Sequence, residues 1–87
     1  MSELDLLEFP CDIGIKAIGA GDGSIEGLVL EIVRRHVNEA DIGPVHVRDS
    51  RNGRYQAVTV HVQAENRAQL DAIYEALSSH EKVVMAL

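Results

Sequence analysis

The sequence predicts one small α+β domain with the element order strand, helix, strand, strand, helix, strand. Three observations lead to this prediction. Residues 11–19 alternate in polarity, two stretches carry apolar residues at helical spacing, and two further alternating stretches flank Asn52-Gly53. The 87 residues are enough for one core but not for two. We therefore expect an N-terminal arm at 1–10 and a single domain at 11–87.

The first strand is expected at 11–19, because apolar residues alternate there with polar or small ones. A glycine-rich stretch ends this strand, and the apolar spacing then changes to that of a helix. One stripe along this helix is formed by Ile25, Leu28, Val29, Ile32, Val33, His36 and Val37. We expect His36 to pack at the apolar edge of that stripe.

A β-hairpin is predicted around Asn52-Gly53, because both residues accept the positive φ of a type I′ turn. This turn sets the register of strands 45–50 and 54–64 and places His46 opposite Thr59. The valines then share one face, which we expect to be a dry stripe under both helices: Val45, Val47, Val58, Val60 and Val62.

A second helix is expected after Asn66, which forms a capping box with Gln69, and it ends near His80. Residues 82–87 close the chain as a strand. Right-handed crossovers of the two βαβ halves give a ferredoxin-like sandwich. Its antiparallel sheet has the strand order 4-1-3-2, with both helices on one face and the other face open.

Composition limits the classes of partner. The net charge is −6 and the pI is near 5.0, which argues against nucleic acid and against an anionic membrane surface as partners. Cys11 is the single cysteine and cannot form an internal disulfide, so a cytoplasmic protein is expected. The N-terminus shows no signal-peptide pattern and the chain no long apolar run.

The glycine-rich loop is a candidate ligand site because it precedes a helix, where backbone N–H groups can hold a small carboxylate or other anion. Its residues are Gly19, Gly21, Asp22, Gly23 and Ser24. The spacing matches neither a dinucleotide fingerprint nor a phosphate loop with its lysine. Turn formation is therefore the favoured interpretation, and ligand binding is the alternative.

The histidines and the cysteine give no catalytic set. His46 and His61 are diagonal neighbours on the open face, yet no third ligand is evident near them, so we expect no metal. Asp12 beside Cys11 disfavours a thiolate. We expect no cofactor and no enzymatic activity, and a non-enzymatic regulatory or protein-interaction module is the leading hypothesis.

The open sheet face is the candidate interaction surface. It is expected to carry Ile18, His46, Arg48, Tyr55, His61, Val84 and Ala86, while Val83, Met85 and Leu87 face the core. An exposed apolar patch at the last strand needs a cover. Two covers remain open at this point: the N-terminal arm, through Leu7 and Phe9, or a second copy of the chain.

Several segments in order carry a family resemblance. They are residues 6–11, 16–19, 32–36, 48–55, 69–77 and 80–87, which include Arg48-Asp49-Ser50-Arg51-Asn52-Gly53-Arg54-Tyr55. The chain resembles the YbeD-like family of small bacterial proteins over nearly its whole length. The resemblance implies a cytosolic ferredoxin-like protein similar to ACT-type regulatory domains, which bind small effectors. It implies no activity and no catalytic residues, and Gly19 to Gly23 departs from the family pattern.

Overall fold

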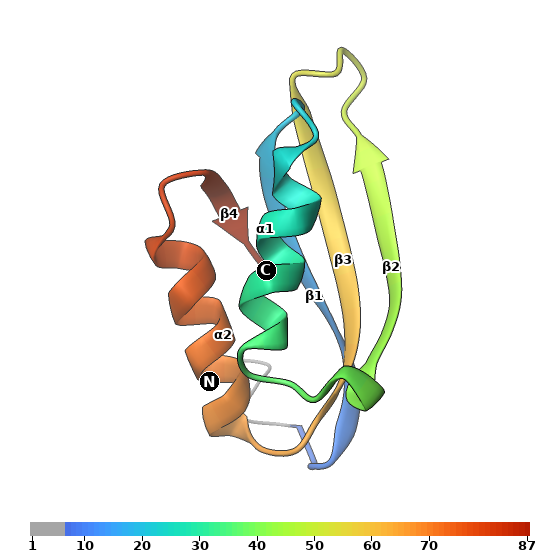
Figure 1. Cartoon of the computed structure of the whole chain (residues 1–87), viewed down its shortest axis with the longest axis vertical. Coiled ribbons are helices and arrows are strands. Elements are labelled where there is room, and N and C mark those ends of the chain that lie inside the picture. Colours follow the sequence, from blue (N-terminus) through green and yellow to red (C-terminus); the bar gives the residue numbers. More distant parts are fainter. Residues whose placement is uncertain (1–6) are drawn as a thin grey trace.

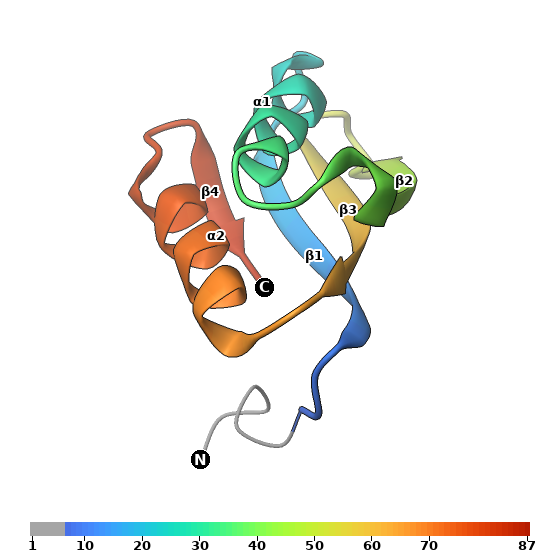
Figure 2. The ribbon, with the colours of Figure 1, turned by 60° about the horizontal axis from the view of Figure 1, so that its bottom comes forward.

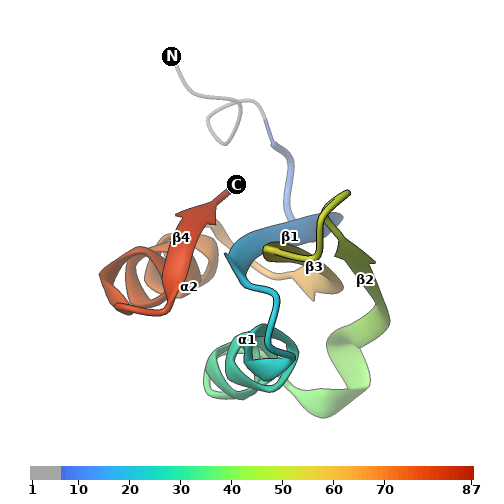
Figure 3. The ribbon, with the colours of Figure 1, turned by 90° about the horizontal axis from the view of Figure 1, so that it is seen from above.

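The fold, seen in a computed structural model that describes residues 7–87, is the predicted α+β sandwich (Figure 1). Its elements are β1 (Cys11–Ala20), α1 (Ser24–Arg34), the short 3-10 helix η2 (Glu39–Asp41), β2 (Ile42–Asp49), β3 (Tyr55–Ala64), α2 (Arg67–Ser79) and β4 (Val83–Ala86). The strands are ordered β2-β3-β1-β4 and paired antiparallel, which confirms the predicted order read from the opposite edge. Both helices lie on the same side of the sheet (Figure 3).

The core lies between the two central strands and the helices. Alternate residues of β1 and β3 are fully buried, and so are the inner faces of α1 and α2. These residues include Ile15, Ala17, Val58, Val60, Ala64, Val29, Val33, Leu70, Ile73 and Leu77. Burying each of the larger aliphatic side chains contributes roughly 1.5–3 kcal/mol to folding. The core is thus made of the aliphatic residues that the alternation of the strands and the helical spacing of the two helices predicted.

The hairpin register is confirmed, whereas its turn differs from the prediction. Val45 lies opposite Val60, and Val47 opposite Val58. The Ser50 N–H donates to the Tyr55 carbonyl at 2.9 Å, which leaves residues 51–54 as the loop. Gly53 alone has a positive φ there, at 71°. The side chain of Asn52 instead accepts the Arg54 N–H at 3.0 Å, so Asn52 stabilises the loop without adopting a left-handed conformation.

The valine stripe is dry only where the helices cover it. Val58 and Val60 are fully buried, Val45 on the outer strand is half-buried, and Val47 is 41% exposed. β2 is an edge strand and lies furthest from α2 in the sheet (Figure 1). The expectation that both helices cover all five valines is therefore wrong for Val47.

The segment after α1 also differs from the predicted helix. α1 ends at Arg34, so His36 lies outside it and its side chain is exposed rather than packed. The His36 carbonyl accepts a hydrogen bond from Gln69 Nε2 at 2.8 Å. Gln69 is held in turn by the confirmed cap, because its N–H donates to Asn66 Oδ1 at 2.9 Å. The N-terminus of α2 thus holds the segment that follows α1 in place through a hydrogen bond.

The described part of the N-terminal arm packs against the core. Leu7 and Phe9 are half-buried and contact the cluster between sheet and helices, so they are used there and not as a cover for the open face. Residues 1–6 lie outside the described part. Within residues 7–87, neither helix has the length and apolar character needed to cross a membrane.

Candidate interaction surface

The open face of the sheet gathers most of the residues expected on it. Ile18 on β1 lies opposite Ala57 on β3, and Ala57 lies opposite Arg48 on β2. Directly paired residues point to the same side of a sheet. Side chains alternate between the two faces along each strand, so the same face also carries Tyr55, His46 and His61. Five residues predicted from the sequence therefore share the open face, together with Lys16 and Thr59.

A β-bulge changes the expected faces of β4. Val83 lies opposite Gly19, whereas Met85 lies opposite Ile18 and Ala86 opposite Ala17, so one extra residue sits between Val83 and Met85. An extra residue inverts the alternation of everything beyond it. Ala86 therefore packs on the helix side, and the expectation that it lies on the open face is wrong.

Met85 and Leu87 take the place that was assigned to Ala86. Met85 shares the face of Ile18, and Leu87 lies opposite Lys16 because the two exchange hydrogen bonds of 3.1 and 2.7 Å. The exposed fractions are 51% for Met85, 58% for Leu87 and 43% for Tyr55. We call the group Ile18, Tyr55, Ala57, Met85 and Leu87 the open-face patch. Val84, in the bulge, is 62% exposed at the edge beside it.

The polar half of the open face contains the two histidines. The rings of His46 and His61 meet edge to face, with centroids 5.4 Å apart. Gly14 lies opposite His61, and a Cβ atom at position 14 would stand 3.5 Å from His61 Cε1. A hollow of about 470 Å³ beside the histidines is also lined by Asp12 and Asp41. Within residues 7–87, however, no three such side chains gather in a way that could hold a metal ion.

The glycine-rich loop is packed against other parts of the chain. The Gly21 N–H donates to the Arg54 carbonyl at 3.0 Å, and a Cβ atom at Gly21 would fall 2.0 Å from the Gly53 carbonyl oxygen. A Cβ atom at Gly19 would stand 2.8 Å from Ile25 Cδ1. These two glycines allow the loop to contact the hairpin and the helix closely, which is the turn-forming role favoured from the sequence.

The remaining loop residues form the start of α1. Gly23 is the N-cap, with a φ of 88°, and Asp22 supplies the acceptor that Gly23 lacks. Asp22 Oδ1 accepts the Ser24 hydroxyl at 2.6 Å and the Ser24 N–H at 2.9 Å. A carboxylate therefore already lies at this helix N-terminus. Binding of an external carboxylate at Gly19 to Ser24 stays a prediction, and its ligand would compete with Asp22.

The hydrogen bonds from Ser24 hold the pKa of the Asp22 carboxyl below its ordinary value. A carboxyl with a lowered folded pKa stabilises the fold above its ordinary pKa, and this stabilisation is lost as the pH falls through the lowered value. Ser24→Ala removes the larger of the two contributions, so we expect the pKa of Asp22 to rise toward the ordinary value. NMR titration of the side-chain carboxyl carbon measures this rise.

The matched control for this prediction is Ser78→Ala, which removes an exposed hydroxyl from α2. It should leave the titration of Asp22 as in the parent chain. If Asp22 titrates identically in the parent and in Ser24→Ala, then the Ser24 hydroxyl does not set its pKa and the described cap is incorrect.

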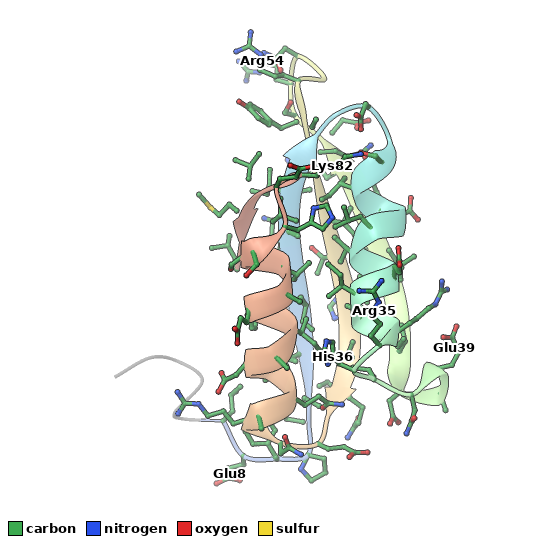
Figure 4. The ribbon with its side chains drawn as sticks, turned by 60° about the vertical axis from the view of Figure 1, so that its left-hand side comes forward. Glu8, Arg35, His36, Glu39, Arg54 and Lys82 are labelled. Atoms are coloured by element: carbon green, nitrogen blue, oxygen red, sulfur yellow. The ribbon has the colours of Figure 1, made fainter. Side chains whose placement is uncertain are left out.

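Charges are distributed unevenly along the molecule. Arg54 at the hairpin loop and Lys82 before β4 lie toward one end, and Glu8 lies at the other (Figure 4). The acids Asp12 and Glu65 also belong to the Glu8 end, because Asp12 is the second residue of β1 and Glu65 follows the end of β3 that pairs with Cys11. Arg51 and Arg54 in the loop between β2 and β3 therefore make this end of the molecule locally basic.

The fold and surface together define a small ferredoxin-like α+β domain with one covered and one open sheet face. The model of the family described as "Protein of unknown function (DUF493)" matches residues 5–87. The chain belongs to this family, and the resemblance to YbeD-like proteins is confirmed. No activity comes with the family.

Similar proteins extend over the same length. A UPF0250 protein of Nitrosomonas europaea, NE1487, is 41% identical over 87 residues and covers 100% of both chains. A UPF0250 protein of Neisseria gonorrhoeae is 42% identical over 86 residues, 99% of this chain and 94% of its own. The solution structure of HP0495 from H. pylori has a TM-score of 0.70 at 18% identity, covering 93% of this chain and 85% of that one, which shows a shared fold.

Proposed function

We propose that this chain is a small protein-interaction module with a regulatory, non-enzymatic role, and that its working surface is the open face of the sheet. The observation behind the proposal is the open-face patch. Tyr55, Met85 and Leu87 each expose more than two fifths of their surface on a face that both helices leave uncovered. Aromatic and methionine side chains are enriched in protein–protein interfaces, so a protein partner fits this surface best.

The face is divided in a way that suits a partner of mixed chemistry. The open-face patch extends over β4, β1 and the start of β3, whereas the polar part carries His46 and Arg48 on β2 and His61 further along β3. An apolar centre supplies the energy of association, whereas the polar side sets orientation through hydrogen bonds and charge. The arrangement offers a broad surface for contact, so it supports a role in binding and not in catalysis.

Position-specific photo-crosslinking in the source cell tests this proposal. Benzoylphenylalanine in place of Met85 presents the probe on the open face, and the same residue in place of Glu26 presents it on the solvent side of α1. We expect defined adducts from position 85 and none from position 26. An adduct of twice the chain mass identifies a second copy as the partner, and other masses are assigned by mass spectrometry.

A second variant checks that the face itself makes the contact. Ile18→Lys places a charge beside position 85 without touching the core, because Ile18 lies opposite Met85 on the open side. It should reduce the yield of the adduct several-fold. Equal adducts from positions 85 and 26, or no adduct from either, would contradict an interaction role for this face.

A further inference from the structure

The edge of β1 is only half occupied. β1 runs over Cys11–Ala20, whereas β4 covers Val83–Ala86 and ends partway along it (Figure 2). The last backbone hydrogen bonds between the two are those that Lys16 exchanges with Leu87. N–H and C=O groups point alternately to the two sides of a strand, so Gly14 and Asp12 direct theirs to the same edge as Lys16. No strand of residues 7–87 pairs with them there.

A groove accompanies this free edge on the helix side. It has a volume of about 630 Å³ and begins where β4 stops, between β1 and α2. Its lining is mainly apolar and includes Leu7, Ile13, Tyr74 and Ala86, and Leu87 borders its β4 end, where its carbonyl oxygen meets Tyr74. The Tyr74 hydroxyl donates to the Leu87 carbonyl at 2.9 Å and so closes the β4 end of the groove. A strand added to β1 would point every second side chain into this groove.

The surroundings of the free edge are acidic. Asp12 lies on the edge strand with its side chain on the open face, Glu8 precedes it, and Glu65 follows the end of β3 that pairs with Cys11. Asp71 and Glu75 are exposed on α2, three residues before and one residue after Tyr74. Two cations lie in the same region, Arg67, which pairs with Asp71 at 3.7 Å, and Lys16. The residues that line the groove carry no charge, and on the segments that flank it these five acids outnumber the two bases, in a chain whose net charge is −6.

We propose that the free edge of β1 binds an extended basic segment of another protein by β-strand addition. The segment extends the line of β4 and exchanges hydrogen bonds with Gly14 and Asp12. Its apolar side chains enter the groove between Ile13 and Tyr74, and its lysines or arginines face the exposed acids of the neighbouring segments. Backbone hydrogen bonds supply affinity in this mode of recognition, and the alternate side chains supply specificity. This inference goes beyond the proposed function, because it concerns the sheet edge and not the open face.

The charge around the edge favours such a partner over a second copy of the chain. Two copies that paired through this edge would bring together two sets of these acids and two net charges of −6. Like charges that face each other across an interface oppose association, whereas a basic segment is attracted to the same acids. Electrostatic interactions therefore favour binding of a basic segment and oppose pairing with a second copy of the chain.

Peptide titration followed by NMR tests the proposal on the full chain. The probe is a short peptide of alternating lysine and valine. We expect it to shift the amide signals of Gly14 and Asp12 and to slow their hydrogen exchange, with little effect at Thr59 on the open face. The same peptide methylated at its backbone nitrogens should lose the effect, because it cannot donate to β1. A peptide in which glutamate replaces lysine should bind much more weakly.

Variants of the chain separate hydrogen bonding from charge. Asp12→Pro and Asp12→Asn both remove the carboxylate, but only the former removes the outward N–H, so we expect it to bind the peptide about tenfold more weakly than Asp12→Asn. Glu75→Lys should weaken binding about two- to fivefold. Glu26→Lys, the same change on α1, should have no such local effect.

Three results would overturn the proposal. The first is equal binding of the methylated and unmethylated peptides. The second is protection of the Gly14 amide in the isolated chain at low concentration, which would mean that the edge is already covered. The third is a change in the Gly14 signal that follows protein concentration alone, which would identify a second copy as the occupant. None of these bears on crosslinking from Met85, so the two proposals fail separately.

Discussion

Val58→Asp is expected to unfold the domain. Val58 is fully buried on β3 beneath the helices, and the described residues around it are aliphatic. An unpaired carboxylate at this position loses its hydration and finds no compensating charge. The cost is about 4 kcal/mol or more, which is comparable with the roughly 5–10 kcal/mol total stability of a domain of this size. Circular dichroism and urea titration should show little or no cooperative transition.

Val47→Asp is the matched control for that change. Val47 lies directly opposite Val58 on the same face of the sheet, yet it is 41% exposed. Its carboxylate reaches water, so the substitution should cost only about 1 kcal/mol, mainly through weaker strand propensity. Equal losses at the two positions would mean that a helix covers β2 as well and that the described edge is incorrect.

The comparison of Val47 with Val58 shows what sequence reasoning resolves in this fold. Alternation and the Asn52-Gly53 dipeptide predict correctly which residues pair and which face they share. These local patterns do not show which strands a helix covers, because that depends on the positions of helices and strands that are distant in sequence. Residues on one face can therefore be predicted together, whereas their burial cannot.

The candidate surface was predictable to the same extent. Ile18, Tyr55, His46, His61 and Arg48 follow from register and lie on the open face. For Met85 and Leu87 the sequence predicts the wrong face, because a single extra residue in β4 inverts the alternation beyond it. Nothing in Val83-Val84-Met85-Ala86 marks that bulge, since all four residues are apolar.

The free edge of β1 cannot be predicted from the sequence, for a related reason. The sequence predicts a last strand at 82–87, and the structure confirms a strand in that range. The strand pairs only with the C-terminal half of β1, however, and this alignment depends on where α2 and the residues between α2 and β4 place it. The resulting open positions at Gly14 and Asp12 are a property of tertiary structure, so local pattern could not reveal them.

Gly21→Ala is the second large effect expected, and it tests the role assigned to the glycine-rich loop. The new methyl group would fall 2.0 Å from the Gly53 carbonyl oxygen, which belongs to backbone and cannot simply rotate away. The loop and the hairpin must separate, and the 3.0 Å hydrogen bond from the Gly21 N–H to the Arg54 carbonyl is lost. We expect the free energy of unfolding to fall by about 2–3 kcal/mol in urea titration.

Gly27→Ala provides the control, since it adds the same methyl group to α1 where nothing lies within 4 Å. This change should raise the free energy of unfolding by roughly 0.5–1 kcal/mol, because alanine loses less backbone entropy in a helix than glycine. The opposite signs of the two glycine substitutions would show that position 21 is a packing contact. A Gly21→Ala chain as stable as the parent would show that the loop does not depend on its contact with the hairpin, and would favour ligand binding as the role of the loop.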